Sequence, residues 1–311
     1  VRIEVEGRTT QRQIRPFVER LDITSALPYM DAFTEILEPV PAHGVFTVDL
    51  RKGDFGMNLH LKPTMGRYNK VAMDRADGII DVRTQIRGTN CNVHLDVTLP
   101  EAVDLKGRKL SGRVTVDNVD NRVRLGFDAK SGFPFPDVLS IVDFIDPALV
   151  ADLSCAAAPS LTCTGHTGIS AADKAYNDLG GTASLAAGAL FGFRFRDLTL
   201  DYRLKGDRLA FSDIHARGKD GGAVTGQCTL FLDDFEAEKA HFALSGSYRD
   251  GTLEELADFL KFEVADRTGH VDADFAFTGP LNTNVLDHLD GRGRMQIKKG
   301  HLMQLKLFAG L

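Results

Sequence analysis

Three consecutive stretches between Phe193 and Leu232 alternate apolar and polar residues almost without interruption, separated only by the turn residues K-G-D and G-G. Successive side chains of a β-strand point to opposite faces, so this alternation predicts strands with one apolar and one solvated face. The pattern skips one position at Arg196-Asp197 and again at Ser212-Asp213. These skips predict β-bulges that bend two paired strands at one level. A chain of this kind must form a sheet whose apolar face is either covered by other parts of the protein or open to a ligand.

The same alternation recurs on both sides of this stretch. Short turns join the segments, which is typical of an antiparallel meander. The expected strands cover residues 1–6, 45–50, 55–61, 79–86, 92–99, 113–119 and 122–129, and later residues 270–278, 293–298 and 301–308.

Apolar residues at helical spacing predict three helices, over residues 15–37, over residues 136–150 and from Thr252 onward. The third begins with Thr-Leu-Glu-Glu, a capping box in which Glu255 returns the bond that Thr252 makes. Residues 154–190 are rich in Gly, Ala and Thr, and we expect them to be irregular, with a short helix over residues 170–179.

Pro28 breaks the first helix, and counted from there the helices begin near residues 28, 137 and 252, about 110 residues apart. Such a period indicates an array of repeats along one axis. After the first and third helices, a glycine again leads into an alternating strand, H-G-V-F-T-V-D in one case and T-G-H-V-D-A-D in the other. We therefore predict three diverged helix-plus-meander copies. They cover residues 1–135, residues 136–250 with a Cys-containing loop at 154–190, and residues 251–311 as the start of a truncated third copy.

The composition limits the classes of function that this chain can have. The formal net charge of −6 argues against a nucleic-acid-binding protein, which usually carries a basic excess. The aromatic residues are 20 Phe and 5 Tyr without Trp, and Phe supplies apolar area without a polar atom that needs a partner. No signal peptide and no apolar run long enough for a membrane span are visible. Because the chain starts at Val1 and ends within an apolar run, we expect an excised piece, with any membrane anchor outside it.

Catalytic motifs are missing from the sequence. It contains no G-x-S-x-G elbow, no Walker loop and no H-E-x-x-H, so we name no catalytic residue, expect no enzyme and expect no cofactor. His270, Asp272 and Asp274 place three potential metal ligands on one strand face. They are more simply explained as the solvated face of that strand, and no metal site is predicted there.

The four cysteines are too few for a disulfide scaffold. Cys155 and Cys163 share the Gly/Ala/Thr-rich segment, and either a disulfide between them or two thiols would fit the sequence. A disulfide would favour an oxidising compartment. Together with His166 they lack an obvious fourth ligand, so we expect no zinc site.

The alternation leaves two uses for the apolar face. A closed sandwich would bury it against a second sheet, and patterning alone favours such a packed core. An elongated sheet curled into a trough would leave it open for an apolar ligand.

The closing segment favours the trough. Residues 289–305 read L-D-G-R-G-R-M-Q-I-K-K-G-H-L-M-Q-L, which resembles the strand-turn-strand signature L-x-G-x-G-x-φ-x-φ-x-x-G-x-φ of bacterial AsmA-like proteins, φ being apolar. The run L-A-F-S-D-I-H-A-R-G from Leu209, followed by G-A-V-T-G from Gly222, is similar to the repeat of the same family. The resemblance covers about residues 190–311, and the first half follows it only in overall pattern.

This resemblance implies a function. AsmA-like proteins are envelope proteins anchored in the inner membrane, and their periplasmic part is a long twisted β-sheet folded into an apolar groove. They are related to chorein-type bridge-like lipid-transfer proteins and are implicated in moving phospholipids toward the outer membrane. We therefore expect a mainly-β, elongated, twisted antiparallel sheet curled into a groove, with a few short amphipathic helices. The implied partner is phospholipid or another acyl-chain lipid, in the periplasm of a Gram-negative cell envelope. The Ala/Thr/Gly-rich insertion with two cysteines departs from the family pattern.

In that interpretation the apolar side chains of the strands line the groove. The expected lining residues are Val93, Leu95, Val97, Val116, Leu125, Phe127, Phe193, Phe195, Leu200, Tyr202, Phe211, Leu230, Phe242, Leu244, Phe275, Phe277, Ile297 and Leu305. The charged residues expected outside it are Arg83, Arg194, Arg196, Arg203 and Lys298. The alternative is a structural or adhesive β-repeat scaffold of the envelope with a packed interior. A polysaccharide-processing β-solenoid is the weakest interpretation, because it calls for exposed Tyr or Trp.

Overall fold

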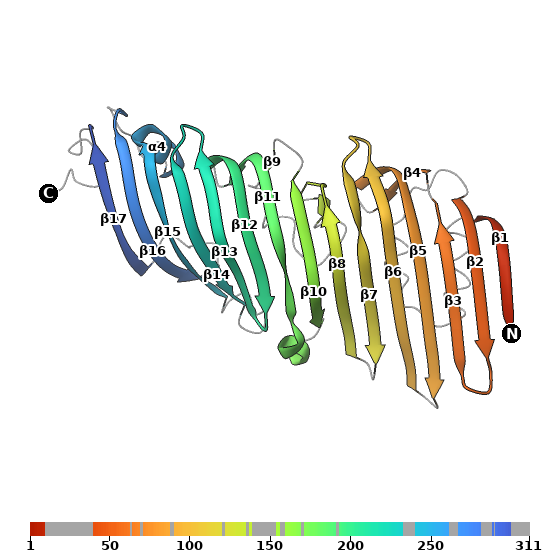
Figure 1. The fold of residues 1–311 in the computed structure, drawn as a ribbon. Coiled ribbons are helices and arrows are strands. Elements are labelled where there is room, and N and C mark those ends of the chain that lie inside the picture. Colours follow the sequence, from red (N-terminus) through yellow and green to blue (C-terminus); the bar gives the residue numbers. More distant parts are fainter. Residues whose placement is uncertain are drawn as a thin grey trace. The chain divides into compact units, whose positions relative to one another are not determined.

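The protein is built mainly of β-strands (Figure 1). The chain forms two compact units, Val1–Pro147 with Thr162–Asp173 as unit 1, and Ala148–Leu161 with Lys174–Leu311 as unit 2. The computed structural model describes residues 1–9, 40–62, 64–68, 71–87, 90–119, 122–134, 137–138, 154–155, 159–168, 171–190, 193–232, 240–260, 267–280, 288 and 290–299.

Unit 1 is an antiparallel meander. Its strands are β1 (Arg2–Thr9), β2 (Val40–Asp49), β3 (Asp54–Leu61), β4 (Thr64–Tyr68), β5 (Val71–Arg87), β6 (Asn90–Asp104), β7 (Lys109–Val119), β8 (Arg122–Ser131) and most of β10 (Ser160–Gly168). Strand β1 pairs with β2, β2 pairs with β3, and β3 pairs with β5. From β5 to β8, each strand pairs with the next. The short β4 folds back on β5, and β10 pairs with β8.

Unit 2 repeats this organisation, and its described part includes the helix α4 (Leu253–Leu260). Its strands are β9 (Ser154–Cys155), β11 (Asp178–Leu190), β12 (Phe193–Lys205), β13 (Arg208–Gly218), β14 (Ala223–Phe231), β15 (His241–Thr252), β16 (His270–Pro280) and β17 (Asp290–Lys298). From β11 onward every strand pairs antiparallel with its successor. Strand β9 pairs with the edge of β11 that faces away from β12. The sheet is not closed on itself (Figure 1).

The strands expected in described parts of the chain are confirmed, and several are longer than predicted. The segment 154–190 was predicted wrongly as irregular, because most of it forms β10 and β11, with the 3-10 helix η3 (Ala171–Tyr176) between them. The helix expected over residues 15–37 and the strand over residues 301–308 lie outside the described residues. Of the helix over residues 136–150, only Asp137 and Val138 are described, and both are helical. The division into three copies stays a prediction.

Both predicted bulges are confirmed. The register of β12 against β13 shifts on either side of Thr199, and that of β13 against β14 shifts between Phe211 and Ile214. Asp197 and Asp213 occupy these positions with φ of 52° and 48°. Asp is one of the few residues other than Gly that tolerates this left-handed conformation. A further bulge in unit 2, in β15, was not predicted, and Asp250 adopts a φ of 52° there.

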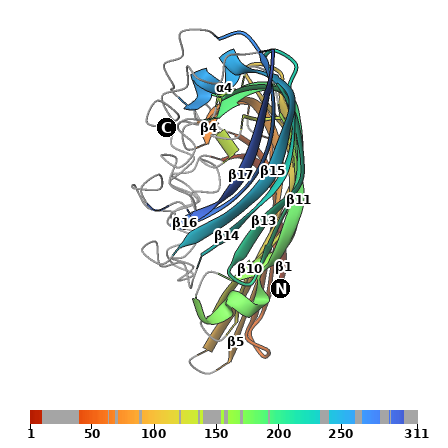
Figure 2. The same cartoon turned by 90° about the vertical axis from the view of Figure 1, so that its left-hand side faces the viewer.

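Helix α4 lies on one side of the unit 2 sheet (Figure 2). Leu253 and Ala257 are buried against Tyr248 and Val271 of the strands. At the start of the helix, the backbone N–H of Glu255 donates to Oγ1 of Thr252 at 3.1 Å, which confirms the forward half of the capping box. The helix thus covers the sheet at the end where β15 finishes and β16 begins.

Two glycines of the closing motif lie opposite two phenylalanine rings. Gly291 and Gly293 of β17 pair with Phe277 and Phe275 of β16, whose rings stack with centroids 6.1 Å apart. A Cβ at Gly291 would overlap the carbonyl oxygen of Ala276 and lie 2.8 Å from the Cα of Phe277. A Cβ at Gly293 would find its nearest neighbour at 3.4 Å, an ordinary contact. The two positions therefore differ in how much space a side chain has.

This difference predicts opposite outcomes for two alanine variants on one strand. Gly291→Ala should lower the free energy of unfolding of unit 2 by about 1–3 kcal/mol, because β17 must shift away from β16. Gly293→Ala serves as the matched control and should change it by less than about 0.5 kcal/mol. Urea unfolding followed by circular dichroism measures both, and equal effects would show that the packing on Phe277 is not the cause.

Candidate functional site

The register of unit 2 gathers apolar residues on one face of its sheet. Residues directly opposite each other on antiparallel strands share a face. Tyr202 lies opposite Phe211, Phe211 opposite Cys228, Cys228 opposite Leu244, and Leu244 opposite Phe277. One row of apolar side chains therefore crosses β12 to β16.

Further rows run parallel to this one on the same face. Toward one end of the strands, Leu204, Leu209, Leu230 and Phe242 follow one another across β12 to β15. Toward the other end, the row passes through Ala216, Val224, Tyr248, Ala273 and Met295, next to helix α4. The apolar face of unit 2 thus extends over most of the length of its strands.

Unit 1 has an apolar face of the same kind. Across β3, β5, β6, β7 and β8, one row consists of Met57, Val82, Leu95, Val116 and Leu125. The next row contains Val97, Val114 and Phe127. The alternation read from the sequence is therefore kept in phase from strand to strand.

The structure divides the predicted lining residues between these two faces. Leu125 and Phe195 are buried, and the other described members are half-buried. On the face of unit 1 lie Val93, Leu95, Val97, Val116, Leu125 and Phe127. On the face of unit 2 lie Phe195, Leu200, Tyr202, Phe211, Leu230, Phe242, Leu244, Phe275, Phe277 and Ile297. The side chain of Phe193 and the whole of Leu305 are outside the described residues.

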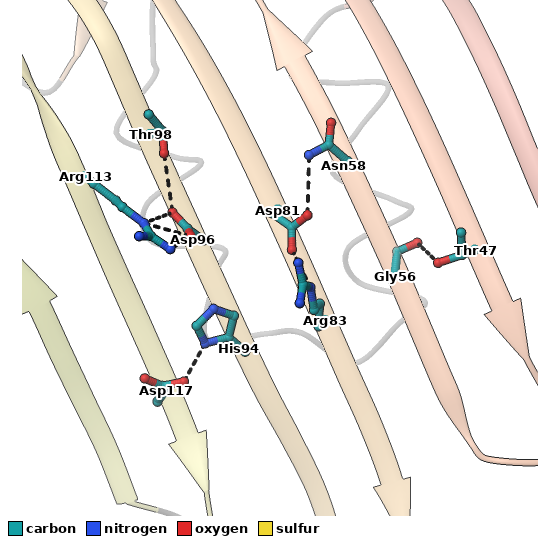
Figure 3. A network of polar contacts seen from close by, with 10 residues as sticks. All are labelled: Thr47, Gly56, Asn58, Asp81, Arg83, His94, Asp96, Thr98, Arg113 and Asp117. Atoms are coloured by element: carbon teal, nitrogen blue, oxygen red, sulfur yellow. Dashed lines mark hydrogen bonds and ion pairs between the residues drawn. The ribbon is translucent and has the colours of Figure 1, made fainter.

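The opposite face of unit 1 is polar and carries ion pairs between neighbouring strands (Figure 3). His94 Nδ1 lies 2.5 Å from a carboxylate oxygen of Asp117, and Arg113 binds both oxygens of Asp96. The hydrogen bond from the Arg113 guanidinium lowers the pKa of Asp96. These charged groups are therefore paired in the solvent-facing layer.

Unit 2 has a polar face of the same kind. Arg203 binds Asp178 through two hydrogen bonds of 2.9 Å, and Lys298 donates to Asp272 at 2.7 Å. The five charged residues predicted to lie outside the apolar lining are all exposed, namely Arg83, Arg194, Arg196, Arg203 and Lys298.

The strand face considered for metal ligands also carries ion pairs. Asp272 accepts from Lys298, which lowers the pKa of the Asp272 carboxyl, and Asp274 pairs with Arg249. Within the described residues, no three His, Cys, Asp or Glu side chains are grouped as a metal site would need.

A buried carboxylate fixes α4 to the sheet. Glu255 is only 7% exposed, and its two oxygens accept from the backbone N–H of Lys219 at 2.6 Å and from the hydroxyl of Tyr248 at 2.5 Å. The capping box predicted that this carboxylate would turn back toward Thr252, whereas in the structure it binds Tyr248 of β15 and the turn that follows β13. Gly222 leaves space for the tyrosine, because a Cβ there would lie 2.5 Å from its ring.

The cysteines give no new site. The side chain of Cys155, in β9, lies outside the described part of the chain, so its bridge to Cys163 stays a prediction. Cys228 is half-buried in the apolar row between Phe211 and Leu244, and burial raises the pKa of its thiol. It acts there as a small apolar side chain.

Comparison of the chain with protein-family models, with curated proteins and with solved structures finds no match. In the described part of the structure, no helix has the length and apolar character needed to cross a membrane.

The Tyr248–Glu255 contact predicts how stability depends on alkaline pH. Burial, together with the bond to Glu255, raises the pKa of Tyr248 above its ordinary value of about 10. The folded state therefore keeps a proton that the unfolded state loses. The stability that the protonated Tyr248 side chain gives the folded state is fully present below about pH 10. Above that pH it falls, by up to about 1.4 kcal/mol per pH unit.

The Tyr248→Phe variant isolates this effect. Urea unfolding between about pH 9 and pH 11 should show a smaller loss of stability in the variant than in the wild type. Glu255→Gln should give an intermediate slope, since it removes the carboxylate but not the burial. Identical slopes in all three proteins would contradict the assignment.

Proposed function

We propose that the apolar faces of the two units bind the acyl chains of phospholipids and allow them to move along the sheet. The observation that carries this proposal is the unbroken apolar row through Tyr202, Phe211, Cys228, Leu244 and Phe277, with half-buried side chains on one face of an open sheet. Among the described residues, only the eight-residue helix α4 packs on this face, at one end. A face of this kind suits an extended alkyl chain better than a compact polar ligand.

The mechanism is passive. Each methylene removed from water contributes about 0.8 kcal/mol, so an alkyl chain lying across successive apolar rows is stabilised at every position. Because the rows have similar composition, neighbouring positions have similar energies, and the barrier to sliding is low. No residue has to perform chemistry, so the protein is proposed to be a carrier rather than an enzyme.

The bulges support a curled sheet. Bulged strands bend and twist more strongly than regular ones. Asp197, Asp213 and Asp250 place bulges on three strands of unit 2, with β12 and β13 adjacent. We assign to them the curvature that turns an apolar face into a groove, and to α4 the role of narrowing the groove at one end.

The sequence resemblance adds the cellular setting to this proposal. As an AsmA-like protein, the chain would belong to an envelope protein held in the inner membrane by a segment outside these residues. Its groove would carry phospholipid through the periplasm toward the outer membrane. The paired charges of the opposite face are compatible with a surface that remains in water.

Purified protein should retain phospholipid from the cells that express it. Extraction followed by mass spectrometry should detect lipid in an amount comparable to that of the protein, and adding phospholipid to delipidated protein should raise the melting temperature. Lipid-free protein whose melting temperature does not respond would refute the proposal. It would favour the structural or adhesive scaffold with a packed interior.

A second experiment asks which face holds the lipid. A photoreactive amino acid such as benzoylphenylalanine replaces Leu244, on the apolar face of β15, or Ser245, which follows it on the polar face. After incubation with phospholipid vesicles and illumination, we expect lipid adducts at position 244 and a several-fold lower yield at position 245. Equal yields would show that the lipid binds non-specifically.

A further inference from the structure

Two polar side chains interrupt the apolar face of unit 1. At one level of the sheet, the residues facing each other across β3, β5, β6, β7 and β8 are Phe55, Thr84, Val93, Asn118 and Val123. Thr84 and Asn118 therefore lie on either side of Val93, on the same face as the predicted lining residues. Strands are spaced by about 4.8 Å, so the two side chains are separated by roughly 10 Å.

One oxygen atom of each of these side chains lacks a hydrogen-bond partner within the described structure. Thr84 is 6% exposed, and neither its hydroxyl oxygen nor the buried Oδ1 of Asn118 has a partner within the described structure. A buried polar atom without a partner is costly, and native proteins rarely retain one without a reason. Valine and leucine would fit the apolar pattern at these positions without that cost.

The positions of Thr84 and Asn118 along their strands indicate what these residues contact. Thr84 is three residues from the end of β5, and Asn118 is one residue from the end of β7. The purely apolar rows of Leu95 and Val97 begin only on one side of this level. A lipid whose chains lie over those rows would therefore have its polar part at the strand ends, next to Thr84 and Asn118.

We propose that Thr84 and Asn118 recognise the polar part of the bound lipid, and that this lipid carries an N–H or O–H donor. The inference rests on the proposed lipid-binding function and specifies which lipids that site prefers. The amide oxygen of Asn118 can only accept a hydrogen bond, so it selects a ligand that donates one. The hydroxyl of Thr84 both donates and accepts, so it can bind an ester carbonyl or a ligand hydroxyl.

The donor can come from an amine or from a hydroxyl group, and three soluble short-chain phospholipids distinguish them. Phosphatidylethanolamine and phosphatidylcholine are both zwitterionic and differ in that choline has no N–H. Phosphatidylglycerol supplies hydroxyl donors instead. We expect the wild-type protein to bind the ethanolamine lipid, the glycerol lipid or both about fivefold more tightly than the choline lipid, which is the effect of one net hydrogen bond. Titration calorimetry of delipidated protein measures the three affinities.

Two variants assign the preference to these residues. Asn118→Leu should abolish the preference and leave the affinity for the choline lipid unchanged. Thr84→Val, which keeps the shape of the side chain, should lower the affinity for all three lipids by a similar factor of about five. Both variants should melt no lower than the wild type, because each removes a buried atom that lacks a partner.

The outcomes separate this inference from the function on which it rests. If the wild type binds all three lipids equally, or if the preference survives in Asn118→Leu, the recognition role is refuted while lipid binding stands. If the three lipids all fail to bind the wild type, both are refuted. Should Asn118→Leu not fold, the affinities of Thr84→Val still decide, since unchanged binding would contradict the role of the pair.

Discussion

Matched register is the constraint on which this structure depends. A β-strand exposes alternate residues on its two faces, so a slip of one residue between neighbours would turn every apolar side chain of a strand to the polar face. Tyr202, Phe211, Cys228, Leu244 and Phe277 fall on one row only because four successive pairings keep this phase. The two-faced character of the sheet is thus a property of all its strands together.

The bulges maintain this phase where the sequence breaks it. Phe195 and Leu198 are three positions apart, and a regular strand would direct them to opposite faces. The extra residue at the bulge, with Asp197 in the left-handed conformation, restores both to the apolar side, where they pack together. An Asp at such a position is therefore part of the folding pattern rather than a charged interruption.

The alternation predicted the strands and the bulges of β12 and β13, because large side chains at period two are distinctive. It failed for β11, where Gly181 and Ala183 separate Leu179 from Leu185 on the apolar face. The register explains this composition, since Gly181 lies opposite Tyr202 and Ala183 opposite Leu200. Small residues are compatible with a bulky neighbouring strand, yet in isolation they have the composition of a loop.

The contacts by which Glu255 fixes α4 to the sheet could not be predicted from the sequence, for a related reason. The capping box is a local pattern, and it correctly placed the start of α4. The partners of the Glu255 carboxylate are Tyr248 of β15 and the backbone of Lys219, in the turn after β13. No spacing along the chain indicates that the turn after β13 and Tyr248 of β15 both contact the helix, so only the fold could show these contacts.

The two faces contribute unequally to stability. Exposed ion pairs such as Arg203–Asp178 contribute at most about 1 kcal/mol each, so the polar face mainly keeps the sheet solvated. Most of the favourable free energy must come from removing the apolar rows from water. Where α4 covers the face, Leu253, Ala257 and Val271 supply that burial from the chain itself.

Over the half-buried central rows, a bound acyl chain would supply the same burial. A ligand that binds only the folded state adds to its stability by mass action. The stability of the central rows would therefore rise with lipid occupancy. On this argument, an empty groove is also the least stable form of the sheet. The protein would therefore tend to release one lipid only as it acquires another.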